Sequence, residues 1–200
     1  IVHYPTLSRQ FSTCPKDFSL AATPRRHDPQ RRARIAKAAL DVIAEKGVAG
    51  PTHRRVATAA DVPLGSTTYH FANLDELLTE AFTLLANTTS ASFAEQLAAA
   101  QTEEQACEVV ADLAMGEGWA TERTMILSYE LYAYAARNSA LRSVMNDWMN
   151  KSRAALERHF TAETARILDA MIEGLVIHRF VDPQPMGRRQ ILNIVEKIIR

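Results

Sequence analysis

Residues 52–71 place two short helix-forming segments on either side of a tight turn, and this stretch constrains the fold more than any other. Thr52 can cap the first segment. The helical pattern stops near Asp61, where a polar residue and then Pro63 interrupt it. Two short helices with such a connection predict a helix-turn-helix, whose second helix enters the major groove of DNA. The apolar positions expected on one face of the first helix are Val56, Ala59 and Ala60.

The second segment, residues 64–71, carries small hydroxyl side chains and two aromatic hydrogen-bonding side chains within two helical turns. Such side chains can reach base edges and phosphate oxygens. The residues of this segment expected to contact DNA are Gly65, Ser66, Thr67, Thr68, Tyr69 and His70. Phosphate contacts are expected from Thr52, Arg54 and Arg55, and from the basic run before the first helix, which contains Arg25 and Arg26. A solvated basic segment is the alternative interpretation of that run.

The stretch from Arg32 through Leu78 resembles the DNA-binding domain of the tetracycline-repressor (TetR) family of bacterial regulators. The residues that carry the resemblance are the Arg/Ala-rich first helix ending at Glu45-Lys46-Gly47, then Thr52, Arg55-Val56-Ala57, Ala60-Asp61-Val62, Gly65, Tyr69-His70-Phe71 and Asp75-Glu76-Leu77-Leu78. Many relatives have an aromatic residue where this chain has Thr68 and a Lys where it has Leu74, so one groove contact and one phosphate contact differ here. The resemblance implies a DNA-binding regulator.

Charge is distributed unevenly along the chain, although the formal net charge is zero. Residues 1–74 hold eleven Lys and Arg against five Asp and Glu, and residues 75–200 hold twelve against eighteen. A basic end and an acidic remainder fit one part that faces DNA and one part that phosphate repels. We therefore expect a helix-turn-helix DNA-binding domain over residues 24–74, a ligand-binding and dimerisation domain over residues 75–200, and a loose N-terminal extension over residues 1–23.

Composition excludes several other classes of protein. Hydrophobic residues make up 47% of the 200-residue chain, with few Gly and Pro, which indicates a helical globular protein. Strand-like alternation is missing, so the expected class is all-α. Cys14 and Cys107 form no CxxC or Cys/His cluster, so no disulfide framework, metal site or cofactor is expected. No apolar run approaches the roughly 18 residues of a membrane span, and a cytoplasmic protein without membrane contact is expected.

Capping signals predict about nine helices. The first is expected to have Asp28 as its cap and Pro29 at its first position, and to run to Lys46. Asn73 and Glu76 form a capping-box pattern that opens a long helix joining the two domains. Five further helices are expected to open at Thr102, Thr121, Asn138-Ser139, Thr161 and about Gly187.

The last two expected helices are apolar along more than a single stripe, and a terminal helix with so much apolar surface needs a partner. Self-association through a four-helix contact is the preferred interpretation, with burial inside one subunit as the alternative. The TetR resemblance implies the same homodimer, because members of that family dimerise through their last two long helices. The residues expected at the contact are Leu168, Met171, Ile172, Leu175, Ile191, Ile194, Val195 and Ile198.

Aromatic residues and methionines gather in the middle of the second domain, where they can line a cavity or form ordinary core. The TetR resemblance implies a small-molecule effector site in this region. Glu130 is the most specific residue in it, because a carboxylate in an apolar segment needs a partner: a ligand, Arg123, Arg137 or a backbone group. The residues expected to contact the effector are Met115, Trp119, Met125, Tyr129, Glu130, Tyr132, Trp148 and Met149.

Two other functional classes have less support in the sequence. An all-α di-metal enzyme requires Glu-x-x-His pairs, and neither Glu157 nor Glu173 has a His three residues on. Sequence motifs of zinc proteases, serine hydrolases and nucleotide-binding loops are also missing. A small-molecule or protein-binding module that has kept the scaffold without binding DNA is the second alternative. The sequence favours a homodimeric repressor, not an enzyme, released from a near-palindromic double-stranded DNA operator by a small-molecule effector.

Overall fold

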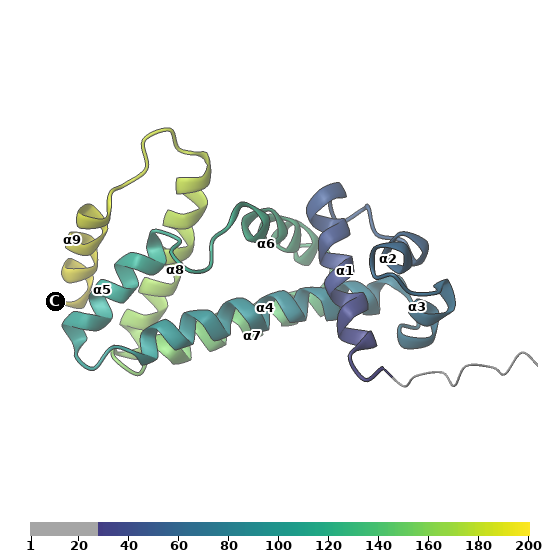
Figure 1. Cartoon of the computed structure of the whole chain (residues 1–200). Helices are drawn as coiled ribbons and strands as arrows, with labels where there is room; N and C mark the ends of the chain where they lie inside the picture. The colour runs from purple at the N-terminus through teal and green to yellow at the C-terminus, as the bar shows by residue number, and fades with distance from the viewer. Residues whose placement is uncertain (1–27) are drawn as a thin grey trace, which may run out of the picture.

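The structure, a computed structural model, describes residues 28–200 (Figure 1). Arg25, Arg26 and the expected extension over residues 1–23 lie outside this range. Within it the chain forms α-helices and no strand, which confirms the all-α class. The helices are α1 (Arg31–Lys46), α2 (His53–Ala59), α3 (Leu64–His70), α4 (Leu74–Ala98), α5 (Glu103–Ala114), α6 (Glu122–Ala135), α7 (Ser139–Leu156), α8 (Ala162–Val181) and α9 (Arg188–Ile199).

Most helices begin where a polar side chain caps them. Each of these caps accepts a hydrogen bond from a backbone N–H in the first turn, which satisfies a donor that has no partner within the helix. The N-terminus of α4 adds a second bond, since Glu76 accepts from the N–H of Ala72 at 2.8 Å. The side-chain caps are Thr52, Asn73, Thr102, Thr121, Asn138 and Thr161.

The start of α1 differs from the prediction. The helix begins at Arg31, two residues later than expected, with Gln30 as its N-cap residue. Pro29 lies in the preceding turn, where Asp28 Oδ1 accepts from the N–H of Gln30 at 3.1 Å. The other carboxylate oxygen of Asp28 pairs with Arg34 at 2.7 Å. Asp28 therefore supports the first turn from outside the helix instead of capping it.

The turn between α2 and α3 is tight, as the sequence predicts. Asp61 has φ 51°, the left-handed conformation that breaks the helical path. The buried face of α2 differs from the prediction in one residue: Ala59 is exposed, and Ala57 is buried with Val56 and Ala60 instead. In a helix of two turns, residues 56, 57 and 60 point to the same side, so packing on α1 selects them.

The hydrophobic core has two parts, and α4 runs through both. The first part joins α1, α2 and the N-terminal half of α4 to α6 and the start of α7. The second part joins the C-terminal half of α4 to α5, α7, α8 and α9. Since Phe71, Leu77 and Leu131 belong to the same first part, packing continues across the predicted domain boundary after residue 74. The three N-terminal helices, called the head below, therefore rest on α4 and α6.

Figure 1 shows α4 and α7 side by side along the length of the molecule, with the head at one end and α5, α8 and α9 at the other. Helix α6 lies between these ends and contacts both α1 and α8. None of the helices over residues 28–200 combines the length and apolarity of a membrane-spanning segment. The arrangement makes α4 and α6 the two physical connections between the head and the rest of the chain.

Candidate functional site

Helix α3 presents small polar residues and one large aromatic residue to solvent. Tyr69 is 85% exposed, and its ring meets that of His70 edge-on, with the centroids 5.1 Å apart. Thr68 is also exposed, and its hydroxyl donates to the carbonyl of Gly65 at 3.3 Å. A Cβ added to Gly65 would meet no atom within 4 Å, so the backbone there is open to approach. A face of this kind can contact phosphates and base edges.

Arg32 of α1 fixes the C-terminal end of α3 against α4. Its guanidinium donates to the carbonyl of His70 and pairs with Glu76 at 3.1 Å and Glu80 at 3.0 Å. It also lies over the Phe71 ring, 4.3 Å from the centroid. The carboxylates, that of Glu80 foremost, raise the pKa of Arg32, so the group stays charged. Because its guanidinium has these internal partners, Arg32 supports α3 and is not expected to contact a DNA phosphate.

The start of α2 carries one cation without a partner among the described residues. Thr52 Oγ1 accepts from the N–H of Arg55 at 3.2 Å, which caps the helix. The guanidinium of Arg55 donates to the carbonyl of Gly50 at 2.7 Å and so supports the α1–α2 loop. Arg54 is exposed, and its side chain bonds to nothing else over residues 28–200. Among residues 28–200, Arg54 is thus the cation at the start of α2 that is free to meet a phosphate.

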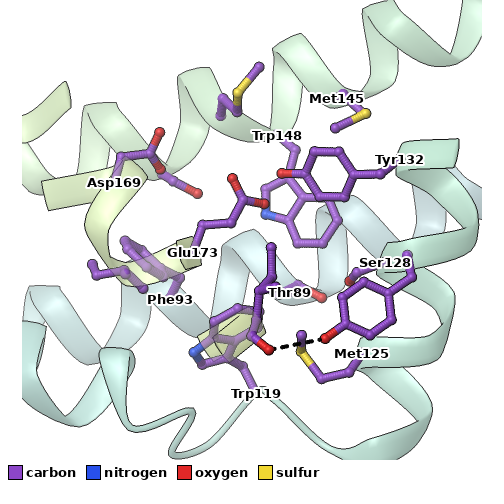
Figure 2. Close-up of a pocket in the computed structure, with 15 residues that line it drawn as sticks. Thr89, Phe93, Trp119, Met125, Ser128, Tyr132, Met145, Trp148, Asp169 and Glu173 are labelled. Carbon is purple, nitrogen blue, oxygen red and sulfur yellow. Dashed lines mark hydrogen bonds between the residues drawn. The ribbon is translucent and has the colours of Figure 1, made fainter. Parts of the chain in front are cut away.

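A cavity lies between α4, α6, α7 and α8, where the two parts of the core meet (Figure 2). The space open to the centre of a water-sized sphere is about 50 Å³, so the cavity is narrow. Aromatic rings and methionine side chains form most of its wall, and small hydroxyl side chains lie among them. The lining residues are Thr89, Phe93, Trp119, Met125, Ser128, Tyr129, Tyr132, Met145, Trp148, Met149, Ser152, Asp169, Ile172, Glu173 and Ile177.

Two carboxylates of α8 reach this cavity. Asp169 Oδ2 accepts a hydrogen bond from Arg153 Nε of α7 at 2.9 Å. Burial nevertheless raises the pKa of Asp169, because it outweighs the lowering effect of Arg153. Glu173 lies one turn further along α8, beside Trp148 in Figure 2, and has no hydrogen-bonding or ionic partner within residues 28–200. Burial alone raises the pKa of Glu173.

Hydrogen bonds hold two aromatic side chains of the cavity wall in place. The indole N–H of Trp119 donates to the carbonyl of Leu113 at 3.0 Å. The hydroxyl of Tyr129 donates to the carbonyl of Ile177 at 3.4 Å. The Tyr129 ring also meets Phe180 edge-on, with the centroids 5.8 Å apart. The polar ends of both large side chains are therefore satisfied, and their apolar faces are left to the cavity.

Helix α6 connects the cavity to the head. Its residues Met125, Ser128, Tyr129 and Tyr132 form one stripe along the cavity wall. Its other sides contact the head and α4. Glu130 Oε2 accepts from the N–H of Val48, Arg123 pairs with Asp41 of α1, and the Tyr134 hydroxyl donates to Asp75 of α4. A shift of α6 would therefore be transmitted directly to α1, to the α1–α2 loop and to α4.

Metal and thiol chemistry have little support in the described part of the chain. Residues 28–200 contain no group of three or more His, Cys, Asp and Glu that could hold a metal ion. Cys107 is buried in the second part of the core, and burial raises its pKa to about 11. Its thiol is therefore protonated at neutral pH and poorly reactive.

Known proteins resemble this chain along most of its length. The family of tetracyclin repressor-like C-terminal domains matches residues 101–200. The solved structure of SCO7518 from Streptomyces coelicolor A3(2) is 47% identical, with a TM-score of 0.81, and the match covers 86% of this chain and 99% of that one. The chain belongs to the TetR family. Family membership identifies it as a DNA-binding transcriptional regulator and not an enzyme.

Two further relatives of this TetR regulator agree with the assignment. The multidrug-binding protein EbrR, solved in complex with ethidium, is 34% identical with a TM-score of 0.71, and the match covers 85% of this chain and 99% of EbrR. The HTH-type transcriptional regulator PksA of Bacillus subtilis (strain 168) is 23% identical over 178 residues, which are 83% of this chain and 86% of PksA.

The structure of this TetR regulator corrects one residue of the expected DNA-contacting set. Thr67 is fully buried, and its hydroxyl donates to the carbonyl of Leu64 at 2.8 Å. The prediction that Thr67 faces the groove is therefore wrong, because Thr67 lies on the face of α3 that packs into the head. The other expected residues of α3 have exposed or half-exposed side chains or backbone: Gly65, Ser66, Thr68, Tyr69 and His70.

The cavity collects most of the expected effector contacts but not all of them. Trp119, Met125, Tyr129, Tyr132, Trp148 and Met149 line it. Met115 does not line it, because it lies beside Arg179, whose Nε donates to the Met115 carbonyl at 3.2 Å. Glu130 does not line it either, because it lies off the stripe of α6 that faces the cavity and binds the Val48 N–H instead. The expected alternative of a backbone partner for Glu130 is thus confirmed.

The two acidic residues of the cavity are absent from the set predicted from the sequence. Asp169 and Glu173 are four residues apart, so they share one face of α8. Their signal was present in the sequence, since both interrupt the apolar run from Leu168 to Ile177. Two acidic residues one turn apart within such a run indicate a polar site facing the interior.

Four of the eight residues expected at the dimer contact are buried within their own subunit. Leu168, Ile172, Ile191 and Val195 are at most 3% exposed and belong to the second part of the core. They have no surface left for a second copy, so this part of the prediction is wrong. The remaining four are half-buried and stay candidates: Met171, Leu175, Ile194 and Ile198.

Proposed function

We propose that this chain is a cytoplasmic transcriptional repressor that binds a near-palindromic operator as a homodimer and leaves it when a small-molecule effector occupies the cavity. The observation that carries the proposal is the double role of α6. One stripe of this helix forms the cavity wall, and Glu130 and Arg123 on its other sides bond to the head. Occupancy of the cavity and orientation of the head are therefore physically connected.

The DNA contacts of this proposal come from α3 and the start of α2. Ser66, Thr68, Tyr69 and His70 would face the major groove, with Gly65 allowing close approach of the backbone. Arg54 would hold a phosphate, together with Thr52 and Arg55 at the N-terminus of α2. Arg25 and Arg26 would add cations beside this surface, in phosphate or minor-groove contacts.

A homodimer would place two α3 helices on successive turns of the duplex, which is why the operator is proposed to be near-palindromic. Its contact would use the half-buried residues Met171 and Leu175 of α8 and Ile194 and Ile198 of α9. Exposed apolar residues of α8, Ile167 and Val181 among them, support association through this helix.

The release step of this proposal follows from the size of the cavity. Because only about 50 Å³ of the cavity is open to the centre of a water-sized sphere, an organic effector must push its walls apart. The methionines of the wall can change rotamers, and α6 can move with them. The effector then releases DNA only to the extent that it prefers the widened state over the DNA-binding state. EbrR, solved with ethidium, proflavin and malachite green, supports an effector site in a protein of this fold.

The test of DNA binding begins with operator fragments selected from a genomic library by the purified chain. Tyr69→Ala is expected to weaken binding to the selected fragment by roughly tenfold or more, since the variant removes a large exposed side chain from the groove-facing surface. Arg54→Ala is expected to lower the slope of log affinity against log salt by about 0.9 if this residue neutralises one phosphate. The matched control is Arg142→Ala, an exposed Arg of α7, which is expected to leave that slope unchanged.

If the wild-type chain retains no genomic DNA at low salt, the repressor is ruled out, and the alternative of a small-molecule or protein-binding module on the same scaffold replaces it.

The dimer has a separate test. Ile194→Glu is expected to yield monomers in sedimentation and to weaken operator binding, because a charge cannot be buried unpaired at an apolar contact. Ser143→Glu places the same charge on an exposed position of α7 and is expected to leave the dimer intact. A dimer unaffected by Ile194→Glu contradicts the proposed contact.

A further inference from the structure

The cavity contains one negative charge that the described part of the protein does not neutralise. Of its two carboxylates, Asp169 is paired with Arg153 at 2.9 Å, and these two charges offset each other. Glu173 has no partner over residues 28–200. The remaining titratable groups on the wall, Tyr129 and Tyr132, are neutral near pH 7. The cavity therefore has a net charge of minus one when Glu173 is ionised.

An unpaired carboxylate in an apolar site is costly, and an incoming ligand determines whether that cost is removed. An anionic ligand would meet Glu173 at close range with like charge. A neutral ligand would fill the space beside Glu173 and leave its charge without compensation. A ligand with a positive charge near Glu173 would provide the missing counter-ion, so the carboxylate favours a cation over the other two classes.

The rest of the wall determines what kind of cation fits. A hard metal ion needs several oxygen ligands, and one free carboxylate without a third acidic partner does not provide them. The faces of Trp119, Trp148 and Phe93 instead offer aromatic surface for flat rings and for a delocalised positive charge. Figure 2 shows Glu173 amid these rings, with Trp148 and Tyr132 on one side and Trp119 on the other.

We propose that the cavity selects an aromatic organic cation with a single positive charge, and that Glu173 is the residue that pairs with this charge. Asp169 acts as a positioning residue, because it holds Arg153 and so keeps a second positive charge away from the ligand. The inference that this cation is the effector rests on the proposed function. The binding preference itself does not depend on DNA.

The test compares three probes of nearly the same ring shape and different charge: N-methylacridinium, acridine and an acridine carboxylate. Binding is measured by calorimetry and by quenching of Trp119 and Trp148 fluorescence, at a pH at which acridine is neutral. Wild-type protein is expected to bind N-methylacridinium at least about tenfold more tightly than acridine, which corresponds to ~1.4 kcal/mol, and to bind the carboxylate most weakly.

Glu173→Gln keeps the shape of the side chain and removes its charge. This variant is expected to lose the preference for N-methylacridinium while binding acridine at least as well as the wild type does. The matched control is Glu163→Gln, an exposed residue of the first turn of α8 outside the cavity, which is expected to keep the wild-type preference. Because Glu173→Gln removes a buried charge without a partner, the variant is expected to fold, which circular dichroism verifies.

Three results would overturn the proposal. The first is equal affinity of wild-type protein for N-methylacridinium and acridine. The second is a preference for the cation that survives Glu173→Gln, since another group would then hold the charge. The third is failure of every probe to bind. None of these results depends on operator binding, so a chain that retains no DNA would contradict the repressor while leaving the preference for the cation intact.

Discussion

The carboxylate of Glu130 accepts a hydrogen bond from the backbone N–H of Val48 at 2.9 Å, and this bond joins α6 to the loop between α1 and α2. Gly47 lies directly beside it with φ 72°, and a Cβ at this residue would come within 3.1 Å of Glu130 Oε1. The loop thus approaches the carboxylate closely in a conformation that glycine adopts easily. Glu130 fixes the head to the helix that forms one wall of the cavity.

Glu130→Ala is expected to reduce the coupling between the cavity and DNA. The variant leaves the Val48 N–H without its acceptor, so the free energy of unfolding is expected to fall by about 1–2 kcal/mol in denaturant titrations. The decrease in operator affinity caused by a saturating effector is expected to be smaller than in the wild type. Glu122→Ala, at an exposed position of the same helix, serves as the control. An unchanged effector response in Glu130→Ala would show that α6 acts through its other contacts.

Thr67 and Thr68 are adjacent and are expected to respond in opposite ways to the same substitution. Thr67→Val keeps the shape of a buried side chain but loses its bond to the Leu64 carbonyl, so the free energy of unfolding should fall by about 1 kcal/mol. Operator affinity of the folded variant should stay near the wild-type value. Thr68→Val changes an exposed side chain, so stability should change by less than about 0.5 kcal/mol while operator affinity falls. Anisotropy titrations and thermal melts measure both quantities, and the reverse result would place Thr67 at the groove.

Arg32→Lys is expected to weaken the head without changing its charge. The shorter ammonium cannot pair with Glu76 and Glu80 and also lie over Phe71, so stability should fall by about 1 kcal/mol. Operator affinity should also fall, because the end of α3 loses its support. The slope of affinity against salt should stay at the wild-type value, since Arg32 is proposed to touch no phosphate. A reduced slope would contradict that assignment.

Gly65→Ala is expected to affect stability and operator affinity differently. A methyl group at this position meets nothing in the free protein, and alanine favours the helix, so stability should be unchanged or rise by up to about 1 kcal/mol. The same methyl group would lie between the backbone of α3 and the duplex, so operator affinity should fall severalfold. Calorimetric melts and anisotropy titrations of one preparation test both expectations. Unchanged affinity would remove Gly65 from the contact surface.

Because Glu173 is buried, the stability of the protein is expected to depend on pH. Burial raises the pKa of this group in the folded state above its ordinary value of 4.5. Its contribution to stability is therefore full below that value and is lost as the pH rises through the folded-state pKa. The unfolding free energy of Glu173→Gln minus that of the wild type should grow over this window in urea titrations. Asp169, Arg153, Tyr129 and Tyr132 are present in both proteins, so their effects on stability should largely cancel. If this difference in unfolding free energy does not change with pH, Glu173 does not ionise in a buried position.

Local signals predicted most of the secondary structure correctly. Thr52, Asn73 and Thr161 begin helices because a cap needs only a side-chain oxygen within reach of the next few N–H groups. Asp28 failed as a predicted cap for the same physical reason: its carboxylate bonds to Gln30 and Arg34 instead. The turn at Asp61 and Pro63 was also predictable, since it depends on backbone preferences of adjacent residues.

The sequence by itself determined the helices, the TetR-like head and the aromatic composition of the cavity, because spacing and residue type are local properties. Only the tertiary structure decided which carboxylate serves which purpose. Glu130 and Glu173 both lie in apolar helices, yet Glu130 holds the head and Glu173 reaches the cavity. The difference comes from the rotation of α6 and α8 about their axes, which packing on α1, α5 and α7 sets and no local pattern contains.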